Sequence, residues 1–247
     1  SDSLGATARY GNGDVQWMTA GNGIEHAEMF PLRHLEKPNP LELFQIWLNL
    51  PAASKRVPPH FTMMWGDTVP THTFTDENGA TTVVTTVAGG LEGKAPPAPP
   101  PKSWASHPAS SVVIWTLVLA PHAEFTLPAA ASGLSRSLYF CRGGGLTAGG
   151  RAIASSQRMR LRSDRAISLV AGEEGAELLL LQGRPIGEPV VQYGPFVMNT
   201  RTEIHQAFLD YQQGGFGGWP WSSDAPAHAR EDGRFAIHAD GRRDVPV

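Results

Sequence analysis

The stretch GDVQWMTAGNGIEHAEMFP, residues 13–31, alternates short runs of strand-forming residues with glycine-rich turns. Within it, TAGNG at residues 19–23 marks a tight turn, because glycine and asparagine tolerate the backbone angles that turns require. We therefore expect one strand before this turn and a second strand, IEHAEMF, after it. The pattern predicts a β-rich protein.

The composition of the whole chain indicates the same class. Of 247 residues, 41% are hydrophobic and only 17% are charged, and the chain contains 27 glycines and 21 prolines. This balance is typical of a compact, turn-rich β protein, and the length fits one large domain or two small ones. A helical bundle and a disordered chain are both disfavoured.

Further along, the pattern predicts several more strands and one helix. LELFQIWLNL at residues 41–50 has the residue types of a buried strand, and TTVVTTVAGG at residues 81–90 is rich in β-branched residues. Five or six short strands between residues 111 and 191 predict a sandwich or barrel. NTRTEIHQAFLDYQQGG predicts a helix, because Thr200 and Glu203 fit a capping box and a glycine pair follows. The proline-rich KAPPAPPPKSW reads as a surface loop, with an SH3-type ligand as the alternative.

Charge and cysteine usage restrict the partners and the location. The formal charge is -3 and the pI is about 6.3, so the sequence predicts no direct binding to nucleic acid or to an anionic membrane. The single Cys141 cannot form an internal disulfide, which favours a reducing compartment, and we expect it to be a small buried apolar residue. No apolar run is long enough to span a membrane. We expect a cytoplasmic protein, or also a nuclear one in a eukaryote.

The stretch after the TAGNG turn carries the chemistry. On a strand, His26 and Glu28 would project to the same face, because side chains two residues apart do so. One imidazole with one carboxylate suits Fe(II), Mn(II), Ni(II) or Zn(II). Two ligands alone are too few, so an ordinary polar strand face is the alternative. The neighbouring glycines complete no phosphate-binding motif and are better explained as turns.

GDVQWMTAGNGIEHAEM, residues 13–29, resembles the signature of the pirin family in the cupin superfamily. DSLG at residues 2–5 resembles the turn that precedes it, and residues 183–217 resemble the C-terminal signature of the family. The resemblance implies an all-β bicupin: two antiparallel β-barrels, the N-terminal one incomplete here, followed by a helix. We expect the remainder of the first barrel in residues 1–58, the second barrel in 59–198, and the helix and tail in 199–247.

The resemblance also implies a single metal, often iron, held by three histidines and a glutamate. His26 and Glu28 match the last two ligands, whereas the HxH motif of the first two is absent from this sequence. Three explanations of this absence are that the chain is a fragment, that its gene is truncated, and that an upstream segment is not included in this sequence. The other histidines occur singly, so we expect iron or another divalent transition metal to be weakly held or absent.

For the full-length protein, the resemblance implies quercetin 2,3-dioxygenase-type activity on a flavonol-like small molecule. Glu28 would then be both ligand and general base, and Gln16, Trp17 and Met18 would line the cavity, with ordinary barrel packing as the alternative for the last two. The chain alone is expected to be inactive. The alternative function is an iron-dependent transcriptional cofactor, or an enzyme-regulating interaction protein without catalysis, whose partner is a protein.

Overall fold

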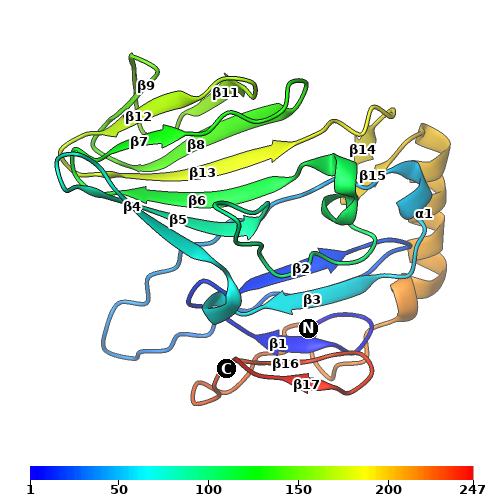
Figure 1. The fold of residues 1–247 in the computed structure, drawn as a ribbon. Helices are drawn as coiled ribbons and strands as arrows, with labels where there is room; N and C mark the ends of the chain where they lie inside the picture. The colour runs from blue at the N-terminus through cyan, green and yellow to red at the C-terminus, as the bar shows by residue number, and fades with distance from the viewer. Residues whose placement is uncertain (247) are drawn as a thin grey trace. The chain divides into compact units, whose positions relative to one another are not determined.

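The computed structural model describes residues 1–246 as antiparallel β-sheets with one α-helix near the C-terminus (Figure 1). The predicted fold class is thereby confirmed. The chain forms two compact units, each described here by itself. The first unit comprises Ser1–Asp67, Pro100–Trp104 and Gly187–Val247, and the second comprises Thr68–Pro99 and Ala105–Ile186. The domain bounds expected from the sequence stay a prediction.

The second unit is built from two antiparallel sheets. The six-stranded sheet has the order β11-β8-β13-β6-β5-β4, and the four-stranded sheet has the order β10-β9-β12-β7. The strands are β4 (Thr71–Thr75), β5 (Thr81–Ala88), β6 (Val113–Leu119), β7 (Glu124–Leu127), β8 (Ser135–Gly143), β9 (Leu146–Ala148), β10 (Arg151–Ile153), β11 (Arg158–Arg162), β12 (Ile167–Ala171) and β13 (Ala176–Gly183). A short 3-10 helix spans Pro108–Ser110.

The core of the second unit lies between these two sheets. Along β5 every second side chain is buried, as expected for a strand with one face toward a core. Leu117 on β6, Leu127 on β7 and Leu169 on β12 are fully buried in a single apolar cluster. Because both sheets contribute to this cluster, removing their apolar faces from water holds them together.

The first unit contains three small sheets and the helix. β2 (Val15–Thr19) pairs with β3 (His60–Met64), β14 (Val191–Tyr193) pairs with β15 (Phe196–Met198), and β16 (Phe235–Ile237) lies between β1 (Thr7–Arg9) and β17 (Arg243–Asp244). The helix α1 spans Arg201–Gly214, and 3-10 helices span Ala52–Ser54 and Gly215–Gly217. Two further 3-10 turns, Gly66–Thr68 and Trp104–Ser106, fall where the chain passes between units.

The predicted helix is confirmed at both ends. The Thr200 hydroxyl accepts the backbone N–H of Glu203 and so satisfies a donor in the first turn of the helix. The Glu203 carboxylate accepts the backbone N–H of Asn199, just before the helix. Gly215 ends the helix in a left-handed conformation, with φ of 52°. Ile204 and Ala207 are buried, so the helix has one apolar face.

Three local expectations were wrong. Residues 41–50 form no strand: Leu43 is 50% exposed and Trp47 is 63% exposed. A strand needs a neighbour to pair with, and none of the described segments pairs with these residues. IEHAEMF likewise forms only one isolated bridge, at His26. Cys141 is half-buried rather than buried.

Candidate metal centre

The antiparallel pair of β2 and β3 positions one side of the candidate site. Gln16 pairs with Met63 and Met18 pairs with Phe61, so Gln16 and Met18 share a face of β2, while Trp17 points to the other face. Met18 packs on a small apolar cluster that contains the buried Phe61. Burial of this apolar face therefore fixes the direction in which the neighbouring Gln16 side chain projects.

A tight turn leads from β2 to the histidine and glutamate. Gly21 has a φ of 53°, and a Cβ at this position would lie 2.2 Å from the Val57 carbonyl oxygen. Only glycine fits here, because both the backbone angle and the close approach exclude a side chain. The Asn22 N–H donates to the same Val57 oxygen at 2.8 Å. The TAGNG stretch is thus a turn, as its residues predict.

After the turn, the chain runs beside its own first residues. The Ser3 N–H donates to the Glu25 oxygen at 2.8 Å, and the Ala27 N–H donates to the Ser1 oxygen at 2.9 Å. Between these two bonds, His26 forms the isolated bridge with Asp2. Residues on both sides of His26 are therefore held by backbone bonds, although its own side chain is exposed.

Both carboxylate oxygens of Glu28 accept hydrogen bonds. The Tyr10 hydroxyl donates to Oε1 at 3.3 Å, and Nε2 of Gln45 donates to Oε2 at 3.3 Å. The Tyr10 hydroxyl also lies 3.2 Å from Oε1 of Gln16. Burial, together with the Glu28 charge and hydrogen bond, raises the pKa of Tyr10 to about 12. Tyr10 is therefore a neutral donor at physiological pH.

The residues present do not fit a complete metal centre. Among residues 1–246, no three histidine, cysteine, aspartate or glutamate side chains are grouped so that they could hold an ion. The remaining histidines therefore do not complete a set with His26 and Glu28. His72, for example, is buried in the second unit, with Nδ1 3.9 Å from the Glu92 carboxylate. The roles of His26 and Glu28 as ligands stay a prediction.

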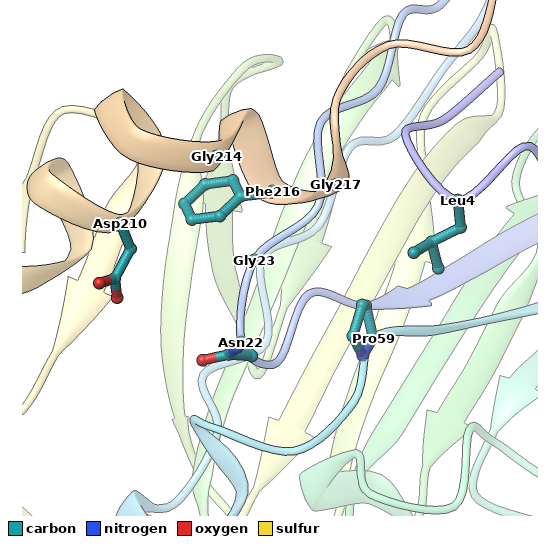
Figure 2. A pocket seen from close by; sticks show the side chains of 8 residues that line it. All are labelled: Leu4, Asn22, Gly23, Pro59, Asp210, Gly214, Phe216 and Gly217. Atoms are coloured by element: carbon teal, nitrogen blue, oxygen red, sulfur yellow. The ribbon is translucent and has the colours of Figure 1, made fainter.

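A hollow of about 310 Å³ lies close to the TAGNG turn in the first unit. Figure 2 shows the Phe216 ring beside Gly23 at this hollow, with Asp210 of α1 and Pro59 nearby. A Cβ on Gly23 would lie 2.3 Å from the Phe216 ring, so the glycine permits this contact. The lining of the hollow includes none of Glu28, Gln16, Trp17 and Met18. The cavity-lining role of those three stays a prediction.

Sequence reasoning missed two hydrogen-bond partners of Glu28. Tyr10 and Gln45 lie 18 and 17 residues away along the chain, and no spacing rule connects them to the carboxylate. Tyr10 stands directly before the GNGD turn, and its position as a large aromatic residue beside a turn is the sequence feature that could have identified it. Gln45 lies in the segment that was wrongly predicted as a strand.

Comparison with known proteins decides the family. Residues 1–48 match the family Pirin, and residues 114–217 match the Pirin C-terminal cupin domain. A pirin-like protein from Caulobacter vibrioides is 33% identical over 216 residues, which cover 87% of this chain and 72% of that protein. The chain belongs to the pirin family. The family match to residues 114–217 lies largely in the second unit of this pirin-family chain, in keeping with the expected cupin barrel.

Other relatives carry a more specific description. A Pseudomonas aeruginosa protein named "Putative quercetin 2,3-dioxygenase" is 34% identical over 218 residues, which cover 87% of this chain and 71% of that protein. A crystal structure titled quercetin 2,3-dioxygenase from Acinetobacter baumannii matches with a TM-score of 0.64 and 25% identity, and covers 83% of this chain and 67% of the other. No helix in residues 1–246 of this pirin-family chain is long and apolar enough to cross a membrane.

Proposed function

We propose that this chain carries the histidine–glutamate part of a flavonol-cleaving site of the quercetin 2,3-dioxygenase type, and that the chain alone is not catalytic. The observation that carries the proposal is the Glu28 carboxylate, which lies within the pirin signature and accepts a hydrogen bond at each of its oxygens. Three relatives with the name "Putative quercetin 2,3-dioxygenase" match 86–87% of the chain, and residues 1–48, which contain the signature, match the family Pirin. The substrate class is therefore a small flavonol-like molecule.

Glu28 is the proposed general base. An ionised carboxylate only accepts hydrogen bonds, so it can take the proton of a flavonol hydroxyl. Gln45 donates to one oxygen and Tyr10 to the other, with the single Tyr10 proton shared between Glu28 and Oε1 of Gln16. The two donors orient the carboxylate. Burial and the Glu28 charge raise the pKa of Tyr10 to about 12, so its hydroxyl stays protonated and donates to the carboxylate.

Metal binding is proposed only for a site that other ligands complete. The family resemblance implies iron or another divalent transition metal, whereas this chain brings together no three candidate ligands in residues 1–246. Two ligands hold a metal far more weakly than four, because each ligand adds to the binding free energy. We therefore expect much less than one metal ion per chain after purification.

A chimera tests the proposal. Residues 1–48 of this chain replace the aligned segment of the Pseudomonas aeruginosa relative, and quercetin consumption is followed by absorbance. We expect the chimera to consume quercetin and its Glu28→Gln variant to lose roughly 100-fold or more of the rate, as expected when a general base is removed. Glu25→Gln is the matched control, three residues away, and should change the rate less than about twofold.

The 247-residue chain is assayed in parallel, with its metal content measured by plasma mass spectrometry. Turnover by this chain alone would contradict the proposal, as would an active Glu28→Gln chimera with unchanged circular dichroism. The unmodified relative is assayed first. If it consumes no quercetin, the proposed substrate class is wrong.

A further inference from the structure

One stretch of the second unit has a net positive charge, because it contains arginines and no acidic residue. Between residues 125 and 163 the sequence contains six arginines and no aspartate or glutamate. The formal charge of the whole chain is -3, so residues outside this stretch sum to -9. Arg136 is buried, and the other five arginines of the stretch are exposed. A locally cationic surface on a protein of net negative charge indicates a local partner rather than general attraction to polyanions.

Three of these arginines form a row on β11. Arg158, Arg160 and Arg162 are exposed, and the residues between them face the apolar core. Alternate residues of a strand lie about 6.6–6.8 Å apart, so the Cα atoms of the three arginines repeat at roughly that spacing. Arg162 is paired with Asp164 at 2.8 Å. In residues 1–246, Arg158 and Arg160 have no ion-pair partner.

This row lies on an open edge of the sheet. β11 is the terminal strand of the six-stranded sheet and pairs on one side only, with β8. In residues 1–246, no strand is hydrogen-bonded to its other side. Such an edge can accept a further strand, whose backbone hydrogen bonds supply affinity and whose side chains supply specificity.

Charges on edge strands also serve to prevent unwanted pairing, which is the competing explanation for the row. The opposite edge of the same sheet argues against a general use of charges to protect the edges of this sheet. There β4 exposes Thr71, Thr73 and Thr75, which are uncharged. The chain thus places arginines on one of the two edges, so the row needs an explanation specific to β11.

We propose that β11 is a docking strand for an acidic peptide segment of a partner protein. The segment adds to the free edge and places carboxylates opposite Arg158, Arg160 and Arg162. Directly opposite residues on neighbouring strands have Cβ atoms about 4.5–5.5 Å apart, which brings carboxylate and guanidinium within ion-pair reach. Apolar residues at the intervening positions lie on the face of Met159 and Leu161. The partner sequence therefore alternates acidic and β-branched apolar residues.

A fluorescein-labelled peptide of alternating glutamate and valine is the probe, and anisotropy is measured at about 50 mM salt, where exposed charges are weakly screened. We expect saturable binding that weakens at least fivefold for the double variant Arg158→Ser and Arg160→Ser. The matched control replaces two exposed arginines outside the row, Arg33→Ser and Arg201→Ser, with the same change in net charge. This control should change the dissociation constant less than about twofold.

A second peptide separates strand addition from simple charge attraction. It carries N-methyl groups on alternate residues, which remove backbone donors and keep every carboxylate, and we expect at least a fivefold loss of binding. Equal binding of the methylated peptide, or tighter binding of a thymidine oligonucleotide, would overturn the proposal and assign the row to polyanions. Absence of binding at about 1 mM peptide would also overturn the proposal, and the role of the arginine row would then be to prevent unwanted pairing at this edge.

Discussion

Replacing Gln182 with methionine should destabilise the second unit, because Arg136 is a buried cation that depends on it. Arg136 on β8 and Gln182 on β13 are direct cross-strand partners, 5% and 9% exposed. Nε of Arg136 donates to Oε1 of Gln182 at 2.7 Å, and Nη1 of Arg136 donates to the Pro128 oxygen at 2.8 Å. Burial lowers the pKa of Arg136, as expected for a cation withdrawn from water.

The magnitude follows from the kind of bond that is lost. Hydrogen bonds to charged groups contribute about 1.5–3 kcal/mol, and a buried donor left without an acceptor pays its desolvation cost. Methionine has nearly the volume of glutamine, so packing changes little. We expect Gln182→Met to lower the free energy of unfolding by about 2 kcal/mol, which is roughly a 30-fold change in the folding equilibrium.

The double variant Arg136→Met with Gln182→Met tests the cause. Removing the buried charge together with its acceptor removes the unpaired cation, so the double variant should be more stable than Gln182→Met alone. Urea unfolding followed by circular dichroism gives these free energies. Gln213→Met, at an exposed position, is the control. The reasoning is refuted if Gln182→Met falls within about 0.5 kcal/mol of the unmodified protein or if the double variant is the least stable.

Three further predictions concern single sites. The Asp76 carboxylate accepts the backbone N–H groups of Glu124, Ala80 and Asn78, which lower its pKa. The ionised carboxylate therefore stabilises the fold above about pH 4, and this stabilisation is lost as the pH falls through the lowered pKa. Thermal unfolding should show Asp76→Asn destabilised at pH 7, with the difference vanishing in acid. Gly21→Ala should lower stability by about 1–3 kcal/mol, whereas Gly11→Ala, which meets open space, should not. Thr200→Ala should cost about 1 kcal/mol through loss of the helix cap, and an unchanged urea midpoint would disprove that role.

What the sequence predicted correctly depends mostly on local patterns. The capping box at Thr200 and the glycine pair that ends α1 act within a few residues, so they can be recognised without a structure. The β-branched run at residues 81–90 likewise became β5, Thr81–Ala88. In both cases the residues that determine the element lie inside it or next to it.

The failures depend on distant parts of the chain. Residues 41–50 have the residue types of a strand, yet a strand exists only where a second strand supplies hydrogen bonds. The partners of Glu28 were missed for the same reason, since Tyr10 and Gln45 reach it through the folded chain. Arg136 shares a strand face with Leu138, and this alternation could have identified it as a charge in an apolar row.

The division of the chain into units also sets the order in which they can form during synthesis. The second unit ends at Ile186, so all its strands are synthesised before α1 and β16. Ala8 of β1 pairs with Ala236 of β16, near the other end of the chain. At about 5–20 residues per second, β1 therefore waits roughly 10–50 seconds for its partner. During that interval the first unit is the part of the nascent chain most in need of a chaperone.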